Sequence, residues 1–286
     1  MKKYTRKDFE RDYPTNEACL HSIFLNRYGK RYACPSCKKR GKFHRIAGRK
    51  RYDCQCGFSV HPLAGTIFHK SDTSLKDWFW AIFLFASSRN GVAAKELERQ
   101  LGMTYKCAWR MGQQIRLLFE QNNIKFYGEV EADETYVGGK GKHNKRGRGA
   151  EHKTPVFGIA SRKGNVKARV VENVKSKTIM PIIQQSVRKQ SIIFTDEFKS
   201  YNRVGSNGYS HETIQHGIKE YVRGKIHTNT IEGFWSQLKR SLDGTHHAVS
   251  PKYLQRYVDE FVYRWNQRLV SRPMFSSILG RAVMPV

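Results

Sequence analysis

Three acidic residues in the second half of the chain fall at the ends of predicted strands and helices. Asp133 lies in the alternating run EVEADETYVGG, Asp196 ends an apolar strand in SIIFTDEFKSY, and Glu232 opens a helix in HTNTIEGFW. Carboxylates supply the oxygen ligands and the negative charge that hard cations such as Mg²⁺ (or Mn²⁺) need. Two such ions about 4 Å apart can activate a water or a 3′-hydroxyl and stabilise the leaving oxygen in phosphoryl transfer. These residues are therefore candidate catalytic residues and metal ligands.

Each carboxylate also has a purely structural interpretation. Asp133 and Asp196 have the positions of turn or edge-strand residues. Asn229 and Glu232 have the spacing of a capping-box variant, in which two side chains satisfy backbone N–H groups at a helix start. We favour the metal-site interpretation for Glu232, with Asn229 as the N-cap of its helix, although Asn229 is a nearby alternative for the third site residue.

The charge of the chain points to a polyanionic partner. Lys and Arg number 52 against 24 Asp and Glu, a formal charge of +28 over 286 residues. Such a surplus is hard to explain for an enzyme of small neutral metabolites, whereas it favours nucleic acid, whose neutralised phosphates release counterions. In the helix of Glu232, Lys239 shares a face with Glu232 and Ser236, at i, i+4 and i+7, and is a candidate contact for a DNA phosphate.

The apolar segments exclude a membrane span and a signal peptide. The N-terminal residues MKKYTRKDFERDYP lack an apolar core, and the most apolar run, WFWAIFLFA, is far too short to cross a bilayer. We expect a cytoplasmic protein associated with the nucleoid. Its six cysteines are then poorer candidates for disulfides than for metal ligands.

Four of the cysteines have the spacing of a zinc ribbon. CPSC contains Cys34 and Cys37, and CQC contains Cys54 and Cys56. Two such knuckles place four thiolates around one structural Zn²⁺, which would supply much of the folding free energy of so small a unit. The second pair is one residue shorter than the usual pattern, so His44 or His61 stays open as a replacement ligand.

A helical pair follows the cysteines. In GVAAKELERQLGMTYKCAWRMGQQIR, Ala94, Leu97 and Leu101 recur at helical spacing, Gly102 breaks the pattern, and Thr104 is a good N-cap for a second helix. A helix, a short Gly-containing turn and a helix form the signature of a helix-turn-helix. The second helix would enter the major groove. Its candidate DNA contacts, which lie off the apolar stripe, are Tyr105, Lys106 and Arg110.

The chain divides into four predicted regions. Residues 1–30 form a helical lead-in, 31–70 the zinc ribbon, 71–128 the helix-turn-helix domain, and 129–286 a catalytic domain of alternating strands and helices. The catalytic domain contains the basic loop 138–153, GGKGKHNKRGRGAEHK, which has no apolar periodicity. We expect this loop, including Arg146 and Arg148, to contact DNA.

The motifs together resemble a known family. CPSC…CQCGFSV…GTIF, LGMTYKCAWRMGQQIR, EADETYVGGK, FTDEFKSY, HTNTIEGFWSQLKR and YVDEFVYRWNQR are similar to the DDE transposases of bacterial insertion sequences with an N-terminal zinc ribbon, a group related to the eukaryotic Merlin transposases. The resemblance covers nearly the whole chain. It matches Asp133, Asp196 and Glu232 to the three acidic residues of the family.

The resemblance implies a multidomain α+β protein whose catalytic domain has a ribonuclease-H-like fold, a mixed sheet flanked by helices. It implies an enzyme that binds terminal inverted repeats, cleaves DNA at the element ends and joins the 3′ ends to target DNA. A homodimer or larger assembly on DNA is expected, because two ends must be held together. Two alternatives remain: a DNA-binding regulator with a vestigial catalytic half, and a nuclease that cuts without joining.

Overall fold

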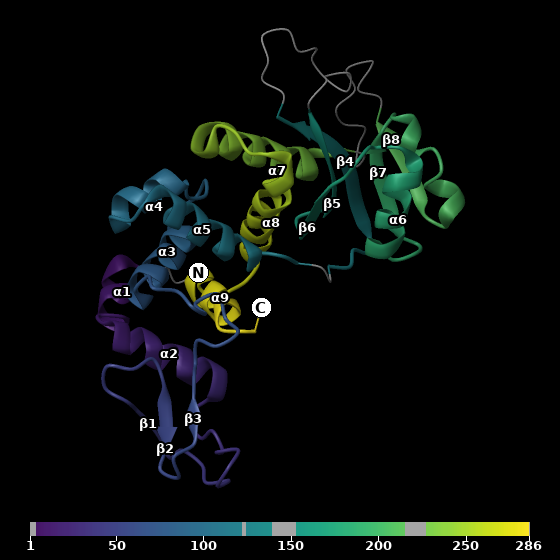
Figure 1. Ribbon diagram of the computed structural model, residues 1–286. Coiled ribbons are helices and arrows are strands. Elements are labelled where there is room, and N and C mark those ends of the chain that lie inside the picture. Colours follow the sequence, from purple (N-terminus) through teal and green to yellow (C-terminus); the bar gives the residue numbers. More distant parts are fainter. Residues whose placement is uncertain (1–3, 122–123, 139–152, 215–226, 286) are drawn as a thin grey trace. The chain divides into compact units, whose positions relative to one another are not determined.

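The computed structural model describes residues 4–121, 124–138, 153–214 and 227–285 (Figure 1). The chain forms two compact units, one of Met1–Leu118 with Ser271–Val286 and one of Phe119–Val270. Within the described residues, no helix is both long enough and apolar enough to span a membrane.

The first unit begins with two helices and a small sheet. Helices α1 (Arg6–Asp12) and α2 (Asn16–Tyr28) are followed by the antiparallel strands β1 (Phe43–Arg45), β2 (Tyr52–Cys54) and β3 (Ser59–Val60), in that order. Tyr52 of β2 stacks on Phe24 of α2 with ring centroids 4.1 Å apart. This packing supplies an apolar contact for a sheet too small to form its own core.

Three helices follow in the region of the predicted helix-turn-helix. They are α3 (Leu75–Ser87), α4 (Ala94–Leu101) and α5 (Tyr105–Leu117). Helix α4 ends at Gly102, whose φ of 62° and ψ of 25° are left-handed values that glycine adopts without strain. The Thr104 hydroxyl accepts the N–H of Cys107 and caps α5, as predicted. The predicted apolar stripe faces inward, with Leu97, Ala108, Met111 and Ile115 buried.

The last helix, α9 (Met274–Ala282), belongs to the first unit and not to the second. Phe275 stacks on Tyr4 with ring centroids 4.7 Å apart and contacts the edges of Phe9 and Phe83. This division differs from the predicted boundaries in two respects. Ser271–Val286 leaves the predicted domain 129–286, because its aromatic partners lie near the N-terminus, and the second unit starts at Phe119 rather than after Gly128.

The second unit is built on a five-stranded mixed sheet. Its strands are β4 (Glu129–Val137), β5 (Thr154–Ser161), β6 (Val166–Val170), β7 (Ile192–Asp196) and β8 (Ser210–Ile214), in the spatial order β6-β5-β4-β7-β8. The β6-β5-β4 side is antiparallel, whereas β7 and β8 run parallel to β4. The expectation of a mixed sheet flanked by helices is confirmed.

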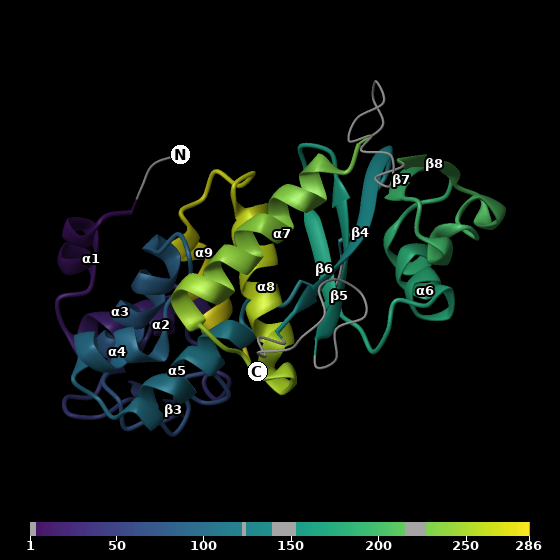
Figure 2. The same ribbon diagram turned by 90° about the horizontal axis from the view of Figure 1, so that it is seen from above.

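Helices cover both faces of this sheet (Figure 2). Helix α6 (Ser176–Ser186) packs on one face, and α7 (Asn229–Ser241) and α8 (Pro251–Gln267) pack on the other. Alternation along β4 sends Val130 and Ala132 into the core beneath α6. Glu131 and Asp133 therefore point to the opposite face, which α7 covers. Two short 3₁₀ helices (Lys199–Tyr201 and Gly205–Asn207) and a π-helical turn (Leu242–His246) complete the unit.

Candidate active site

The first two predicted carboxylates lie on neighbouring parallel strands. Glu131 of β4 pairs with Phe194 of β7. Two residues further along both strands, the same register aligns Asp133 with Asp196, the last residue of β7. Because side chains alternate with a period of two, both carboxylates continue the same face of the sheet.

Helix α7 adds the third carboxylate. Glu232 lies in the first turn of α7, whose buried stripe consists of Ile231, Phe234, Trp235, Leu238 and, at its end, Leu242. Asp133, Asp196 and Glu232 together line one cavity of about 430 Å³. The rest of its lining is Glu134, Thr135, Trp235, Ser236 and Lys239. The predicted shared face of Glu232, Ser236 and Lys239 is thus the face of α7 that borders this cavity.

Asp133 and Asp196 are half-buried, whereas Glu232 is exposed. Desolvation, followed by the negative charge of the adjacent Glu134, raises the pKa of Asp133 to about 7, and the negative charge of Asp196 contributes in the same direction. The indole N–H of Trp235 donates to Oδ2 of Asp133 over 3.0 Å. A partly desolvated carboxyl close to other carboxyls gains from a bound cation, which would offset the repulsion.

Gly158 makes room for this hydrogen bond. It lies on β5 directly opposite Asp133. A Cβ at this position would come within 2.5 Å and 2.6 Å of two carbons of the Trp235 ring and within 2.9 Å of the Ile231 side chain. Sequence reasoning missed both Gly158 and the polar role of Trp235. A glycine inside a strand-like run was the available signal, since it often marks close approach by another group.

The other two carboxylates are held by local bonds. The Phe198 N–H donates to Oδ1 of Asp196 over 3.0 Å, which fixes the turn after β7. The Thr228 hydroxyl donates to Oε1 of Glu232 over 2.7 Å. Glu232 is thereby oriented by the residue that precedes its own helix.

The prediction that Asn229 is the N-cap of this helix is wrong. Asn229 is the first helical residue and Thr228 occupies the N-cap, without a capping bond from its side chain. Glu232 is then one position too late for a capping box, which pairs the N-cap with the third helical residue. Asn229 also does not line the cavity, so its candidacy as the third site residue gains no support.

The four predicted cysteines form a separate cluster in the first unit. All four sulfurs lie within 4.8 Å of one another. Two pairs, Cys34–Cys56 and Cys37–Cys54, have Sγ–Sγ distances of 3.6 and 3.7 Å. A metal–sulfur distance of about 2.3 Å in a tetrahedron gives an edge of about 3.8 Å. The cluster therefore fits a tetrahedral thiolate-bound ion.

The cluster needs no histidine. Among the described residues it is the one group of three or more His, Cys, Asp or Glu placed to hold a metal ion, and neither His44 nor His61 belongs to it. The Phe58 N–H, hydrogen-bonded to the sulfur of Cys56, lowers the pKa of that thiol to about 6, which favours the thiolate needed for ligation. Of the other cysteines, Cys19 is buried and Cys107 is half-buried.

The predicted DNA contacts divide into described and undescribed residues. Tyr105, Lys106 and Arg110 are all exposed on α5, and the Lys95 ammonium lies 5.1 Å from the centre of the Tyr105 ring. Lys239 is exposed at the cavity. Arg146 and Arg148, with most of the basic loop 138–153, lie outside the described residues.

Comparison with known proteins identifies the family. The model of the ISXO2-like transposase domain matches residues 125–266. A transposase-like protein of Haemophilus influenzae is 33% identical over 97 residues, which cover 34% of this chain and 77% of that protein. The chain belongs to the ISXO2-like transposase family. The matched domain contains Asp133, Asp196 and Glu232, whereas the cysteine cluster and α3–α5 of this transposase lie outside it.

Two further similarities extend over more of the transposase. A protein in transposable element ISH50 of Halobacterium salinarum is 28% identical over 250 residues, covering 81% of this chain and 84% of that protein. A chain of a pre-cleavage Mos1 transpososome aligns over 72% of this chain and 79% of its own length, with 10% identity and a TM-score of 0.26. A superposition this loose carries no argument about fold or mechanism.

Proposed function

We propose that this transposase binds the terminal inverted repeats of its insertion sequence, cleaves DNA at the element ends and joins the 3′ ends to target DNA. The observation that carries the proposal is the cavity lined by Asp133, Asp196 and Glu232. They come from β4, β7 and α7, so their meeting is a product of the tertiary structure and not of a local turn. They lie inside the segment that matches the transposase domain.

The three carboxylates fit a divalent cation, and we assign them as its ligands. Carboxylate oxygens are the donors that Mg²⁺ or Mn²⁺ prefers. Desolvation and the neighbouring negative charges of Glu134 and Asp196 together raise the pKa of Asp133, and a bound cation would counter both effects. When bound, the metal would supply an activated water or 3′-hydroxyl and stabilise the leaving oxygen.

The surrounding side chains have supporting roles in this proposal. The Trp235 N–H restrains Asp133 and the Thr228 hydroxyl restrains Glu232. Lys239, at the same cavity, would bind a phosphate of the DNA strand. A ribonuclease-H-like catalytic fold is supported by the order and directions of the five strands.

The first unit supplies the proposed DNA recognition. We assign Zn²⁺ to the four-cysteine cluster because its donor set and sulfur spacing suit that ion. We assign α4 and α5 as a helix-turn-helix, with Tyr105, Lys106 and Arg110 facing the major groove, and Arg146 and Arg148 as backbone contacts. A homodimer or larger assembly on two element ends, action at the nucleoid, and kinship with the Merlin transposases also belong to this proposal.

Purified protein, labelled element ends, target DNA and Mg²⁺ test the function directly. The proposal expects nicking at the element ends and covalent joining of those ends to the target, both abolished by chelation of the metal. Nicking without joining would identify a nuclease. Sequence-specific binding without nicking under any divalent metal would identify a regulator and overturn the catalytic assignment.

A further inference from the structure

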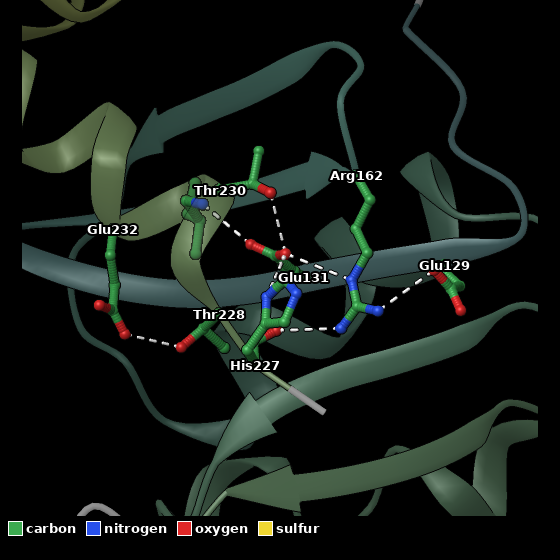
Figure 3. A network of polar contacts seen from close by, with 8 residues as sticks. Glu129, Glu131, Arg162, His227, Thr228, Thr230 and Glu232 are labelled. Carbon is green, nitrogen blue, oxygen red and sulfur yellow. Dashed lines mark hydrogen bonds and ion pairs between the residues drawn. The ribbon is translucent and has the colours of Figure 1, made fainter. Parts of the chain in front are cut away.

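A second acidic residue of β4, Glu131, lies two positions before Asp133 and does not line the cavity. Figure 3 shows its polar contacts. Its side chain is 0% exposed, an unusual environment for a carboxylate. The backbone N–H of Ile231 donates to Oε2 of Glu131 over 3.0 Å, and the Thr230 hydroxyl donates to Oε1 over 2.9 Å. Both donors belong to the first turn of α7, about 100 residues away along the chain.

Two side-chain nitrogens, from Arg162 and His227, also lie close to the carboxylate of Glu131. Nε of Arg162 and Nδ1 of His227 each lie 3.4 Å from Oε1 of Glu131. Arg162 is itself fixed on three sides. It donates to Glu129 over 3.2 Å and to the carbonyl of His227 over 3.2 Å, and its guanidinium carbon lies 3.9 Å from the centre of the Phe194 ring. A buried carboxylate is tolerated when it is paired and hydrogen-bonded in this way.

Glu131 performs the task that a local N-cap usually performs. A helix start leaves backbone N–H groups without partners, and a side chain at the N-cap ordinarily accepts one of them. Thr228 holds the N-cap of α7 but makes no such bond, because its hydroxyl is directed to Glu232. A carboxylate from β4 accepts the N–H of Ile231 instead, and its negative charge also complements the positive end of the helix dipole.

We propose that Glu131, held by Arg162, is a positioning residue that locks the first turn of α7 to β4 and so fixes Glu232 relative to Asp133. This link between Glu131 and Ile231 joins positions close to both carboxylates. Glu131 is two residues from Asp133, and Ile231 directly precedes Glu232. Because the cap comes from the strand and not from the helix, the start of α7 cannot shift without breaking contacts to the strand that carries Asp133. This inference rests on the proposed metal-binding function of Asp133 and Glu232.

The test compares two conservative variants of the full-length protein that affect the same arginine. Glu131→Gln removes the charge that holds Arg162, Thr230 and the helix start. Glu129→Gln is the matched control, because Glu129 also pairs with Arg162 but its side chain is exposed (43%) and, among the described residues, it makes no hydrogen bond to α7. Three quantities are measured well below the melting temperature: Mn²⁺ affinity by calorimetry, hydrogen exchange at the start of α7, and the metal dependence of end cleavage.

We expect Glu131→Gln to weaken Mn²⁺ binding about tenfold or more, as substitutions of residues that orient metal ligands typically do. The metal concentration for half-maximal cleavage should rise in parallel, with partial recovery at high Mn²⁺. Because a Gln side chain has one acceptor oxygen where Glu131 has two, the bonds from Thr230 and Ile231 cannot both persist, and exchange of the Ile231 amide should speed up roughly tenfold relative to the interior of α8. Glu129→Gln should leave all three within about twofold of the wild type, which is the ordinary effect of an exposed ion pair.

A purely structural role gives a different result. A Glu131→Gln protein with a lower melting temperature but unchanged Mn²⁺ affinity and unchanged exchange at the start of α7 would overturn the proposal. If that variant does not fold, Thr230→Val replaces it, because it removes one hydrogen-bond donor to Glu131. Mn²⁺ affinity and exchange at the start of α7 should then change in the same direction but by less. No change in either quantity would overturn the proposal. If the wild-type protein neither binds Mn²⁺ nor cleaves, the proposed function itself fails and the positioning role fails with it, although the exchange comparison still reports whether Glu131 caps α7.

Discussion

Gly158→Ala is expected to disable the site by adding a single methyl group. The new Cβ would lie 2.5 Å and 2.6 Å from two carbons of the Trp235 ring. Ordinary carbon contacts start at about 3.4 Å, so the indole must retreat by about 1 Å. That movement breaks or lengthens the 3.0 Å bond from Trp235 to Asp133.

The expected magnitudes follow from this displacement. Overpacking of a filled core costs about 1–3 kcal/mol, and the disturbed bond to Asp133 adds to it. For a protein of this size, a loss of about 2 kcal/mol lowers the melting temperature by roughly 4–8 °C. A shift of about 1 Å in a group that restrains a catalytic residue costs up to about 100-fold in rate. The assays are calorimetric melting and end cleavage at a temperature where the variant is fully folded.

A double-mutant cycle with Trp235→Phe isolates the cause. Phenylalanine keeps an aromatic ring but lacks the outer ring carbons that a Cβ at Gly158 would strike, and it cannot donate to Asp133. The double variant should therefore be less destabilised than the sum of the two single variants, by about 1 kcal/mol. Gly233→Ala is the control, because its Cβ would meet one carbon of Trp265 at 3.9 Å and it should be neutral or stabilising by up to about 1 kcal/mol.

The interpretation is refuted by a Gly158→Ala protein that melts and cleaves as the wild type does. It is equally refuted by strict additivity in the cycle, which would mean that the added methyl does not act through Trp235.

Further predictions concern the three proposed sites. Glu232→Gln keeps the size and helix propensity but removes the charge a metal needs. The Glu232→Gln protein should have a normal melting temperature and bind element ends normally, yet its cleavage rate should fall by at least about 1,000-fold. Asp133→Asn should behave in the same way. Normal cleavage by either variant would reject the assignment of the three carboxylates as metal ligands. Elemental analysis of protein prepared without chelators should find one zinc per chain, lost in Cys37→Ser together with the fold of residues 31–70; zinc-free wild type would contradict the cluster. Lys106→Ala should weaken binding to element ends by about 1–3 kcal/mol more than binding to random DNA, and equal losses on both would reject α5 as the recognition helix.

Local patterns in the sequence were sufficient for much of the fold. The two cysteine pairs, the break at Gly102 and the cap at Thr104 are each encoded within a few residues, and the structure contains the corresponding cluster and helices. The carboxylates were recognisable because Asp196 ends an apolar strand and Glu232 opens an amphipathic helix. Such patterns predict the structure well because they depend on backbone geometry and burial within one short segment of the chain.

The features that the sequence did not predict depend on distant partners. The start of α7 was misplaced by one residue because its cap comes from Glu131 on another element, and no local motif encodes a tertiary cap. Glu131 itself reads as one more residue in an alternating strand. The placement of Ser271–Val286 in the first unit has the same origin, since Phe275 finds its aromatic partners, including Tyr4, near the other end of the chain.

Hydrogen bonds between β4 and α7 give the helix its register along the strand. Glu131 bonds to the backbone of Ile231, and Asp133 accepts a bond from Trp235, so two residues of strand correspond to four residues of helix. Two strand residues span about 6.7 Å and four helical residues about 6 Å, so the two anchors fit without distortion of either element. The matched spacing aligns the helix with the strand in the same direction. Glu232 follows the first anchor by one residue and is rotated about 100° from it around the helix axis, away from the sheet and into the cavity. A one-residue slip of α7 would break both anchors at once and carry Glu232 away from Asp133, which is why the geometry of this site depends as much on Glu131 and Gly158 as on the three carboxylates.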